Sequence, residues 1–367
     1  MKRLLLVGGG HAHVLVLREL ARRRPAGLEV MLVTPHDRQL YSGMLPGWIA
    51  GHYTTDDLAI PLRPLLQAAG AGGLLDRIVS LDPRQRRVVT AGGTTLEYDL
   101  ISLATGSDIA ADAIEGARQW VLPLRPIEEF VSKWTVLAPQ LAEADRPKIV
   151  VIGAGAGGVE VALAIAYALR AAGNDTQVQL VSGGNLLPGY GESTRQKIRS
   201  ALVRANVRML ESTVTQVTSG HVDLREGASL SSDLTLLASG ASAPAWLRST
   251  GLALDDAGFI QVDRRYRSVS HDTVFAAGDV ATMVGAPRAR SGVYAVRAGP
   301  PLADNLIRQA QGQRLRTHTP QRTALYLLAT GPQHAIASWN GLAWNGDWVW
   351  RWKDRIDCGF IAQFRHA

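Results

Sequence analysis

Short, wholly apolar runs that end in glycine are the most regular feature of the chain. Leu4 to Val7 and Ile149 to Ile152 are two such runs, and the absence of a polar position is typical of strands buried on both faces of a parallel sheet. Val159 to Arg170 contains neither glycine nor proline and predicts a helix after the second run. Strands that alternate with helices predict an α/β fold.

Each of the two strands leads into a glycine-rich turn. The first turn is Gly8-Gly9-Gly10, and the second extends from Gly153 to Gly158. Glycine lets the backbone of such a turn pass close to a pyrophosphate, and the N-terminus of the following helix offers free N–H groups and a partial positive charge. Two turns of this kind predict two dinucleotide sites in one chain.

The two turns match the dinucleotide pattern G-x-G-x-x-G to different degrees. The second turn has glycine at all three positions, namely Gly153, Gly155 and Gly158. The first has Gly8 and Gly10, but His13 stands where the third glycine would let helix and strand pack closely. Two roles for His13 stay open: a tolerated residue at the start of the helix, and a contact to the pyrophosphate.

Neither turn is followed by the acidic residue that usually holds a ribose hydroxyl at the end of the next strand. Thr34 follows the strand Leu28 to Val33, where Asp37 could offer a carboxylate instead. Ser182-Gly183-Gly184 follows the strand Val178 to Val181 and contains no Asp, Glu or Arg. The choice between NADH and NADPH therefore stays open.

Two later strands also end in small residues. Leu103 leads into Ala104-Thr105-Gly106, and Val274 to Ala277 leads into Gly278-Asp279. Glycine at these ends lets a ligand approach the backbone closely. Asp279 has two interpretations, a ligand contact and the N-cap of a following helix.

These motifs, in this order, resemble the two-dinucleotide flavoproteins of the pyridine nucleotide-disulfide oxidoreductase superfamily over residues 1–310. The resemblance implies two Rossmann-like domains, with an FAD domain (1–118 and 251–310) interrupted by an inserted NAD(P)H domain (119–250), and a small C-terminal α+β segment (311–367). It implies FAD contacts at Gly8, Gly10, His13, Thr34, Pro46, Ala104, Thr105, Gly106, Gly278, Asp279 and Ala295. It implies NAD(P)H contacts at Gly153, Gly155, Gly158 and Gly240.

Cysteine content narrows the resemblance. Cys358 is the sole cysteine, so a redox-active cysteine pair, an internal disulfide and a cysteine metal cluster are excluded. What remains is similar to the type II NADH dehydrogenases, and this resemblance implies catalytic roles for Glu160, at the nicotinamide, and Tyr294, in the helix start that faces the flavin. A carboxylate at Glu160 would also simply complement the helix macrodipole.

A narrower resemblance is to the NADH dehydrogenase-like flavoproteins often fused to selenide, water dikinase. It rests on Gly9 to His13, Tyr41 to Gly47, Ala50 to Tyr53 and Lys353 to Asp357. The chain carries no kinase half, so the resemblance only hints at selenium metabolism.

The net charge and the spacing of the histidines limit which ligands and macromolecules the protein is expected to bind. The net charge of +7 fits attraction for anionic dinucleotides, and no nucleic-acid-binding signature accompanies it. His11 and His13 do not share a helix face and lack a third ligand, so we expect no metal site. No apolar run reaches about 18 residues, so we expect a cytoplasmic protein or one held peripherally on the inner face of the membrane.

The C-terminal segment is rich in tryptophan. Asn340-Gly341 and Asn345-Gly346 are hairpin signals that predict a small meander. Trp348, Trp350 and Trp352 alternate with other residues, which predicts a strand with all three on one face. A final helix of about three turns is predicted to carry an apolar stripe that includes Phe360 and Phe364. Core packing, a homodimer contact and weak membrane contact all fit this stripe.

Two functions follow from the resemblance. The first is hydride transfer from NAD(P)H to FAD, followed by electron transfer to an external acceptor, for which a quinone is the expectation. The second is a nucleotide-binding accessory or sensor module in selenium metabolism with little or no turnover. The altered Thr34 and Ser182 positions keep the second function open.

Overall fold

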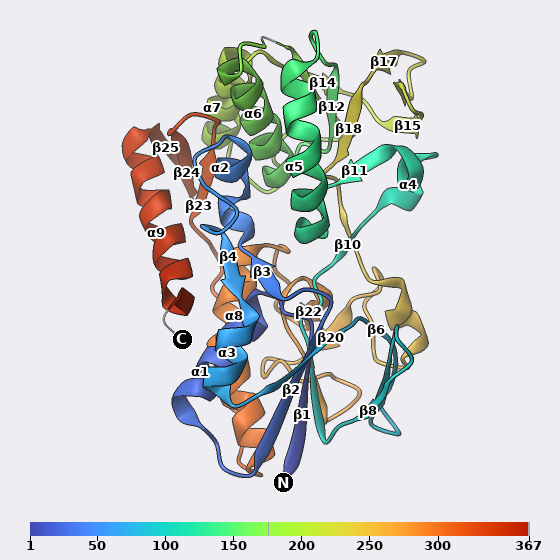
Figure 1. Ribbon diagram of the computed structural model, residues 1–367, viewed down its shortest axis with the longest axis vertical. Coiled ribbons are helices and arrows are strands. Elements are labelled where there is room, and N and C mark those ends of the chain that lie inside the picture. Colours follow the sequence, from blue (N-terminus) through green and yellow to red (C-terminus); the bar gives the residue numbers. More distant parts are fainter. Residues whose placement is uncertain (175, 366–367) are drawn as a thin grey trace.

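Two five-stranded parallel sheets form the framework of the computed structural model, which describes residues 1–174 and 176–365. The first sheet has the order β21-β9-β1-β2-β5, formed by Val274–Ala276, Leu100–Leu103, Lys2–Val7, Leu28–Thr34 and Gly72–Leu75. The second has the order β11-β18-β12-β13-β14, formed by Val121–Pro123, Leu234–Leu237, Ile149–Ile152, Val178–Ser182 and Val207–Glu211. The two sheets lie at opposite ends of the long axis (Figure 1).

The α/β fold with two Rossmann-like units is confirmed. Strand β21 lies next to β9 in the first sheet, although the entire second sheet separates these strands in the sequence. One unit is therefore inserted into the other. The two connections between the units pair with each other as the short antiparallel strands β10 (Asp108–Ile109) and β19 (Ala241–Ser242).

Helices cover both sheets. In the first unit α1 (His11–Arg23) packs against α3 (Leu62–Ala69) and α8 (Gly292–Ala310). A Cβ atom on Gly299 would lie 2.5 Å from the Leu15 Cβ, so glycine is what allows α8 to approach α1 this closely. In the second unit α5 (Ile127–Glu143), α6 (Ala156–Ala171) and α7 (Glu192–Arg204) surround the sheet.

The two units also contain smaller sheets and short helices. Antiparallel sheets are formed by β6-β7-β8 (Ile78–Asp82, Arg87–Thr90, Thr95–Glu97), β15-β16-β17 (Val214–Val217, His221–Leu224, Ser229–Ser231) and β3-β4 (Arg38–Leu40, Ala59–Pro61). Strands β20 (Ile260–Val262) and β22 (Ala281–Met283) form a parallel pair. Two short helices are α2 (Leu45–Ile49) and α4 (Ala117–Trp120).

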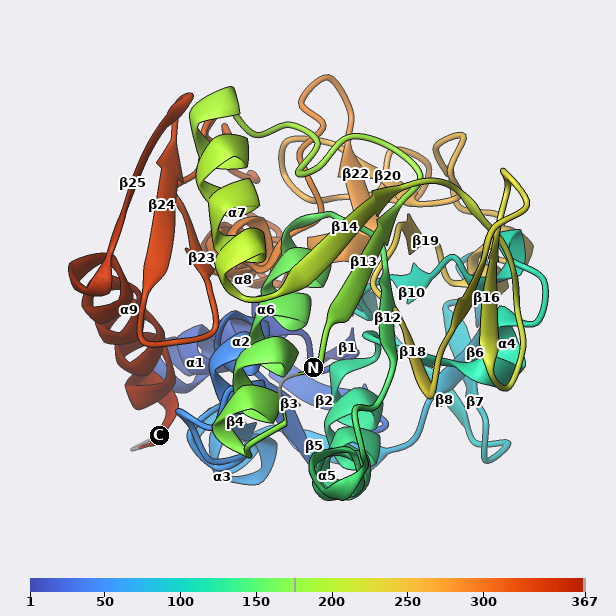
Figure 2. The same cartoon turned by 90° about the horizontal axis from the view of Figure 1, so that it is seen from above.

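The C-terminal segment bridges the two units. Its antiparallel sheet β23-β24-β25 (Tyr326–Ala329, Ala335–Trp339, Leu342–Gly346) packs on α6 and α7, and the last helix α9 (Asp347–Arg365) contacts both that sheet and β4 (Figures 1 and 2). The turn at Asn340-Gly341 is present. The last two residues of the predicted 311–367 segment lie outside the described residues.

The predicted tryptophan strand is wrong. Trp348, Trp350 and Trp352 lie in α9, which has 19 residues rather than about three turns. Gly346 ends β25, and Asp347 opens the helix with an acidic residue in its first turn, where it complements the macrodipole. The buried positions of α9 follow a helical period, namely Val349, Trp350, Lys353, Asp357, Phe360, Ile361 and Phe364. The three tryptophans at every second position obscured this helical period, which is longer than the two-residue period of a strand.

Candidate active site

The first glycine turn is pressed against the end of β9. Gly8 has φ +87°, and a Cβ atom there would lie 2.7 Å from the Ala104 carbonyl oxygen. A Cβ atom on Gly10 would lie 2.5 Å from the same oxygen. The structure therefore brings Gly8 and Gly10 together with the Ala104-Thr105-Gly106 strand end, and only glycine fits at the two turn positions.

His13 supports this turn from inside. Its side chain is fully buried, with Nδ1 2.7 Å from the Gly8 carbonyl oxygen and Nε2 2.8 Å from Ser102 Oγ. A carbonyl can only accept, so Nδ1 carries the proton and Nε2 accepts from the Ser102 hydroxyl. Burial lowers the pKa of His13 to about 4, so the ring is neutral at physiological pH. Both ring nitrogens are used within the protein, which favours a structural role at the start of the helix over a contact to the pyrophosphate, the two roles that the sequence left open for His13.

The second turn has the tighter geometry. Gly153 has φ +110°, and a Cβ atom there would lie 2.7 Å from the Ser239 backbone nitrogen. A Cβ atom on Gly158 would overlap the Gly153 carbonyl oxygen. Gly155 differs from both, since no described atom lies within 4 Å of its Cβ position. Gly153 and Gly158 are thus required by the fold, and Gly155 faces open space at the N-terminus of α6. Gly240 directly follows Ser239 and lies three residues after the end of β18 at Leu237.

The residues at the two altered strand ends point inward. Thr34 is 6% exposed, and its Oγ1 would lie 3.2 Å from a Cβ atom on Gly9. Ser182 is 5% exposed and donates from Oγ to the Gly184 carbonyl oxygen at 2.6 Å. Because both side chains are buried, neither hydroxyl directly replaces the carboxylate that usually binds a ribose hydroxyl at this position.

Asp279 faces an arginine that the sequence did not point to. Asp279 lies in a 3₁₀ turn and makes no N-cap hydrogen bond, so the capping interpretation is wrong. Arg125, at the entry to the inserted unit, donates from one guanidinium nitrogen to Asp279 Oδ2 at 2.9 Å and to Ser107 Oγ at 2.6 Å. The pair joins residues 154 positions apart, so only the folded crossing of the two units reveals it.

The loop from Tyr41 to Gly47 is held by the last helix. The Lys353 ammonium donates at 2.5 Å to the Gly43 carbonyl oxygen and at 2.5 Å to Asp357 Oδ2, and both charged side chains are buried. Pro46 lies in this loop at the start of α2 and is itself buried. The Lys353 to Asp357 motif thus has a physical role, which is to fix α9 on the loop.

Glu160 lies where the second unit meets the C-terminal sheet. It is half-buried in α6, and its Oε1 accepts the Ala329 backbone N–H at 2.8 Å. Burial raises the pKa of Glu160 to about 7, although nearby Lys353 and the Ala329 hydrogen bond oppose the shift. A carboxyl with this pKa exchanges a proton near neutral pH.

The start of α8 lies beside Gly278 and Asp279. A Cβ atom on Gly278 would approach Ala295 Cβ to 3.6 Å, which places Ala295 next to the strand end of β21. Tyr294 is half-buried in the first turn of the same helix. Tyr326 interacts with the Ser291 hydroxyl at this helix start, whereas the buried His11 Nε2 at the start of α1 has no hydrogen-bond partner among the described residues.

These features fit a bound dinucleotide in the first unit. Helix N-termini attract phosphate and other anionic groups, and the unpartnered His11 Nε2 lies at such a terminus, the start of α1. A buried polar group without a partner is costly, so a ligand that supplies the partner is stabilised.

Comparison with known proteins identifies the framework. The family model described as pyridine nucleotide-disulphide oxidoreductase matches residues 2–310. The chain belongs to this family. It is an FAD-dependent NAD(P)H dehydrogenase that resembles the type II NADH dehydrogenases, with FAD as cofactor and NAD(P)H as co-substrate.

Relatives in sequence support this assignment, and one solved structure shares the fold. An NADH dehydrogenase-like protein of Mycobacterium tuberculosis is 28% identical over 302 residues, covering 77% of this chain and 73% of the relative. The demethylphylloquinone reductase of Synechocystis is 24% identical over 290 residues, covering 76% and 71%. The sulfide:quinone oxidoreductase of Aquifex aeolicus has a similar fold, with a TM-score of 0.83, 18% identity and coverage of 100% and 92%.

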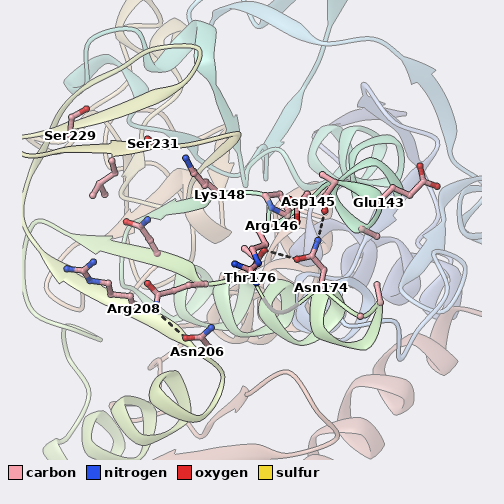
Figure 3. A pocket seen from close by; sticks show the side chains of 18 residues that line it. Glu143, Asp145, Arg146, Lys148, Asn174, Thr176, Asn206, Arg208, Ser229 and Ser231 are labelled. Carbon is pink, nitrogen blue, oxygen red and sulfur yellow. Dashed lines mark hydrogen bonds between the residues drawn. The ribbon is translucent and has the colours of Figure 1, made fainter.

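One polar hollow lies away from this site. The polar hollow in Figure 3 is lined by residues such as Lys148, Asn174 and Asn206, which precede β12, β13 and β14. It therefore lies where these strands begin, at the end of the sheet opposite the glycine turn.

Across residues 1–174 and 176–365, no cluster of three or more His, Cys, Asp or Glu side chains could hold a metal ion. Within the same residues, no helix is both long and apolar enough to span a membrane.

Proposed function

We propose that this dehydrogenase passes electrons from NAD(P)H to a quinone without a cysteine relay. The observation that carries the proposal is the cysteine content: Cys358 is the only cysteine and lies exposed on α9, where its thiol contacts Asp354. A thiol relay needs a pair of cysteines beside the flavin. The quinone reductase activity named for the Synechocystis relative supports a quinone acceptor.

The residues of the first unit would hold FAD. Gly8 and Gly10 would admit the pyrophosphate, and Asp279 and Arg125 would present opposite charges to the ligand. The other residues proposed to line the cofactor are Thr34, Pro46, Ala104, Thr105, Gly106, Gly278 and Ala295. When bound, FAD supplies a ring that accepts a hydride and passes electrons onward.

The residues of the second unit would hold and orient NAD(P)H. Gly155 faces open space at the α6 terminus, so a pyrophosphate can approach its backbone there. Gly153, Gly158 and Gly240 keep the surrounding backbone in place. Glu160 would contact the nicotinamide end and hold or release a proton near pH 7, and Tyr294 would contact the reacting groups from the start of α8.

The C-terminal segment is proposed to meet the membrane from which a quinone arrives. Trp348 and Trp352 are 50% and 40% exposed, and their rings stack with centroids 6.4 Å apart. Arg351 and Arg355 are exposed on the same helix, and tryptophan with arginine is a combination typical of an interface with anionic lipid. One helix gives weak, salt-sensitive attachment.

Steady-state assays with a short-chain quinone test the proposal. We expect the FAD-loaded protein to couple NAD(P)H oxidation to quinone reduction, and Cys358→Ser to keep at least about half of the activity, since an exposed thiol outside the site has little effect. Loss of activity in Cys358→Ser, with unchanged folding, would contradict the relay-free proposal. Bound FAD that no dinucleotide reduces would favour the accessory-module function.

A further inference from the structure

The end of β13 lacks the acidic residue that selects NADH in most dinucleotide sites. Ser182 does not replace it, because its hydroxyl donates to the Gly184 carbonyl oxygen at 2.6 Å and accepts the Gly184 N–H at 3.4 Å. The side chain is also buried. A ribose at this edge therefore needs a partner from another strand.

Glu211 stands on the adjacent strand at the same level. It is the last residue of β14, and the parallel register pairs it with Ser182. The chain just beyond it turns back toward β13, since Thr213 Oγ1 lies 3.3 Å from the Cβ position of Gly183. Glu211 is exposed, and no ion pair joins it to another residue in the part of the chain that the structure describes. Its carboxylate is thus free to bind a ligand.

We propose that Glu211 selects NADH over NADPH in this protein. This inference rests on the proposed nicotinamide site at the second glycine turn. A dinucleotide whose pyrophosphate lies at the start of α6 extends its adenosine half across the end of β13 toward β14. Neighbouring strands are about 4.8 Å apart, and the extra methylene of glutamate helps to span that distance. The carboxylate accepts hydrogen bonds from the ribose hydroxyls and repels a 2′-phosphate.

Arg225 is the competing group at this edge. Its backbone N–H donates to the Thr213 carbonyl oxygen at 2.9 Å, so it lies beside the same segment, and a free arginine there would favour the 2′-phosphate of NADPH. Glu226 opposes it. Glu226 follows Arg225 in the chain and accepts a hydrogen bond from Ser212 Oγ, so a carboxylate lies at the same segment as Arg225. Acidic groups therefore outnumber Arg225 here.

Titration calorimetry of FAD-loaded protein with NAD⁺ and NADP⁺ tests the inference. The oxidised dinucleotides do not reduce flavin, so binding is measured without turnover. We expect NAD⁺ to bind at least about tenfold more tightly, and Glu211→Gln to reduce this preference by about tenfold to hundredfold, the range for a lost charge-assisted hydrogen bond. Arg225→Gln is the matched control and should leave the preference within about threefold.

Three results would overturn the inference. The first is tighter binding of NADP⁺ by the unmodified protein, and the second is an unchanged preference in Glu211→Gln. The third is failure of both dinucleotides to bind. A preference that depends on Glu211 in a protein whose flavin no dinucleotide reduces would instead contradict the proposed function and leave the inference intact.

Discussion

The two glycine turns reach the same backbone path by different means. In the second turn Gly158 allows α6 to lie so close to β12 that no side chain fits between them. In the first turn the equivalent position is His13, whose ring fills the space and hydrogen bonds to Gly8 and Ser102. Close backbone packing at Gly158 therefore fixes the second turn, and the hydrogen bonds of the buried His13 ring fix the first.

This difference shows what the third glycine of the pattern contributes. In neither unit is a side chain at this position open to a ligand, because a Cβ atom on Gly158 would overlap the Gly153 carbonyl oxygen and His13 is fully buried. Its role is to set the distance between helix and strand. A residue that satisfies its polar atoms internally can take that role, so a departure from glycine at this position is weak evidence against a dinucleotide site.

Gly158→Ala should have the largest effect. The added methyl group overlaps the Gly153 carbonyl oxygen, so α6 must move away from the turn. We expect at least about hundredfold weaker NAD⁺ binding with FAD still bound, measured by calorimetry and by the flavin absorbance of the purified protein. Gly157→Ala is the control, since its Cβ would meet only the Leu124 side chain at 3.4 Å. Equal effects of the two substitutions would contradict this account.

His13→Ala should destabilise the first unit. The substitution leaves a cavity and removes the partners of the buried Gly8 carbonyl and Ser102 hydroxyl. We expect the free energy of unfolding to fall by about 2–4 kcal/mol, measured by urea denaturation. His221→Ala, at an exposed position, should change it by less than about 0.5 kcal/mol. A similar small change for His13→Ala would show that the hydrogen bonds of the His13 ring do not support the turn.

Gly155→Ala separates ligand contact from packing. No described atom lies near the Cβ position of Gly155, so the methyl group does not strain the fold. It does enter the space proposed for the pyrophosphate, and we expect about tenfold weaker NAD⁺ binding with an unchanged free energy of unfolding. Unchanged affinity would place the pyrophosphate elsewhere.

The two units should respond oppositely to pH. The pKa of His13 is lowered from 6.5 to about 4, so the unfolded state binds the proton first and stability falls as pH drops from about 6.5 to 4. The pKa of Glu160 is raised from 4.5 to about 7, so the unfolded state loses its proton first and stability falls as pH rises from about 4.5 to 7. Each slope is at most about 1.4 kcal/mol per pH unit.

Unfolding measured from pH 4 to pH 8 checks this pair of slopes. His13→Ala should remove part of the loss on the acid side, and Glu160→Gln should remove part of the loss on the neutral side. The opposite assignment, or no change in either variant, would contradict the burial of these groups as the cause.

Local constraints were predictable from the sequence, and contacts between distant segments were not. Gly8, Gly153 and Gly158 could be assigned because the positive φ of Gly8 and Gly153 and the contact of Gly158 with the Gly153 carbonyl arise within a single turn. Arg125 could not, since its pairing with Asp279 exists only after one unit is inserted into the other. The C-terminal part of helix α9 was predicted, but its first turns were mistaken for a strand, because the alternation of Trp348 and Trp350 masked the helical spacing of Lys353, which is buried through tertiary contacts.

Anaerobic mixing of the FAD-loaded protein with NADH, followed by flavin absorbance, tests the central claim most directly. The account predicts rapid bleaching of the flavin band by NADH and its recovery when a short-chain quinone is added. Bound flavin that neither NADH nor NADPH bleaches would contradict it.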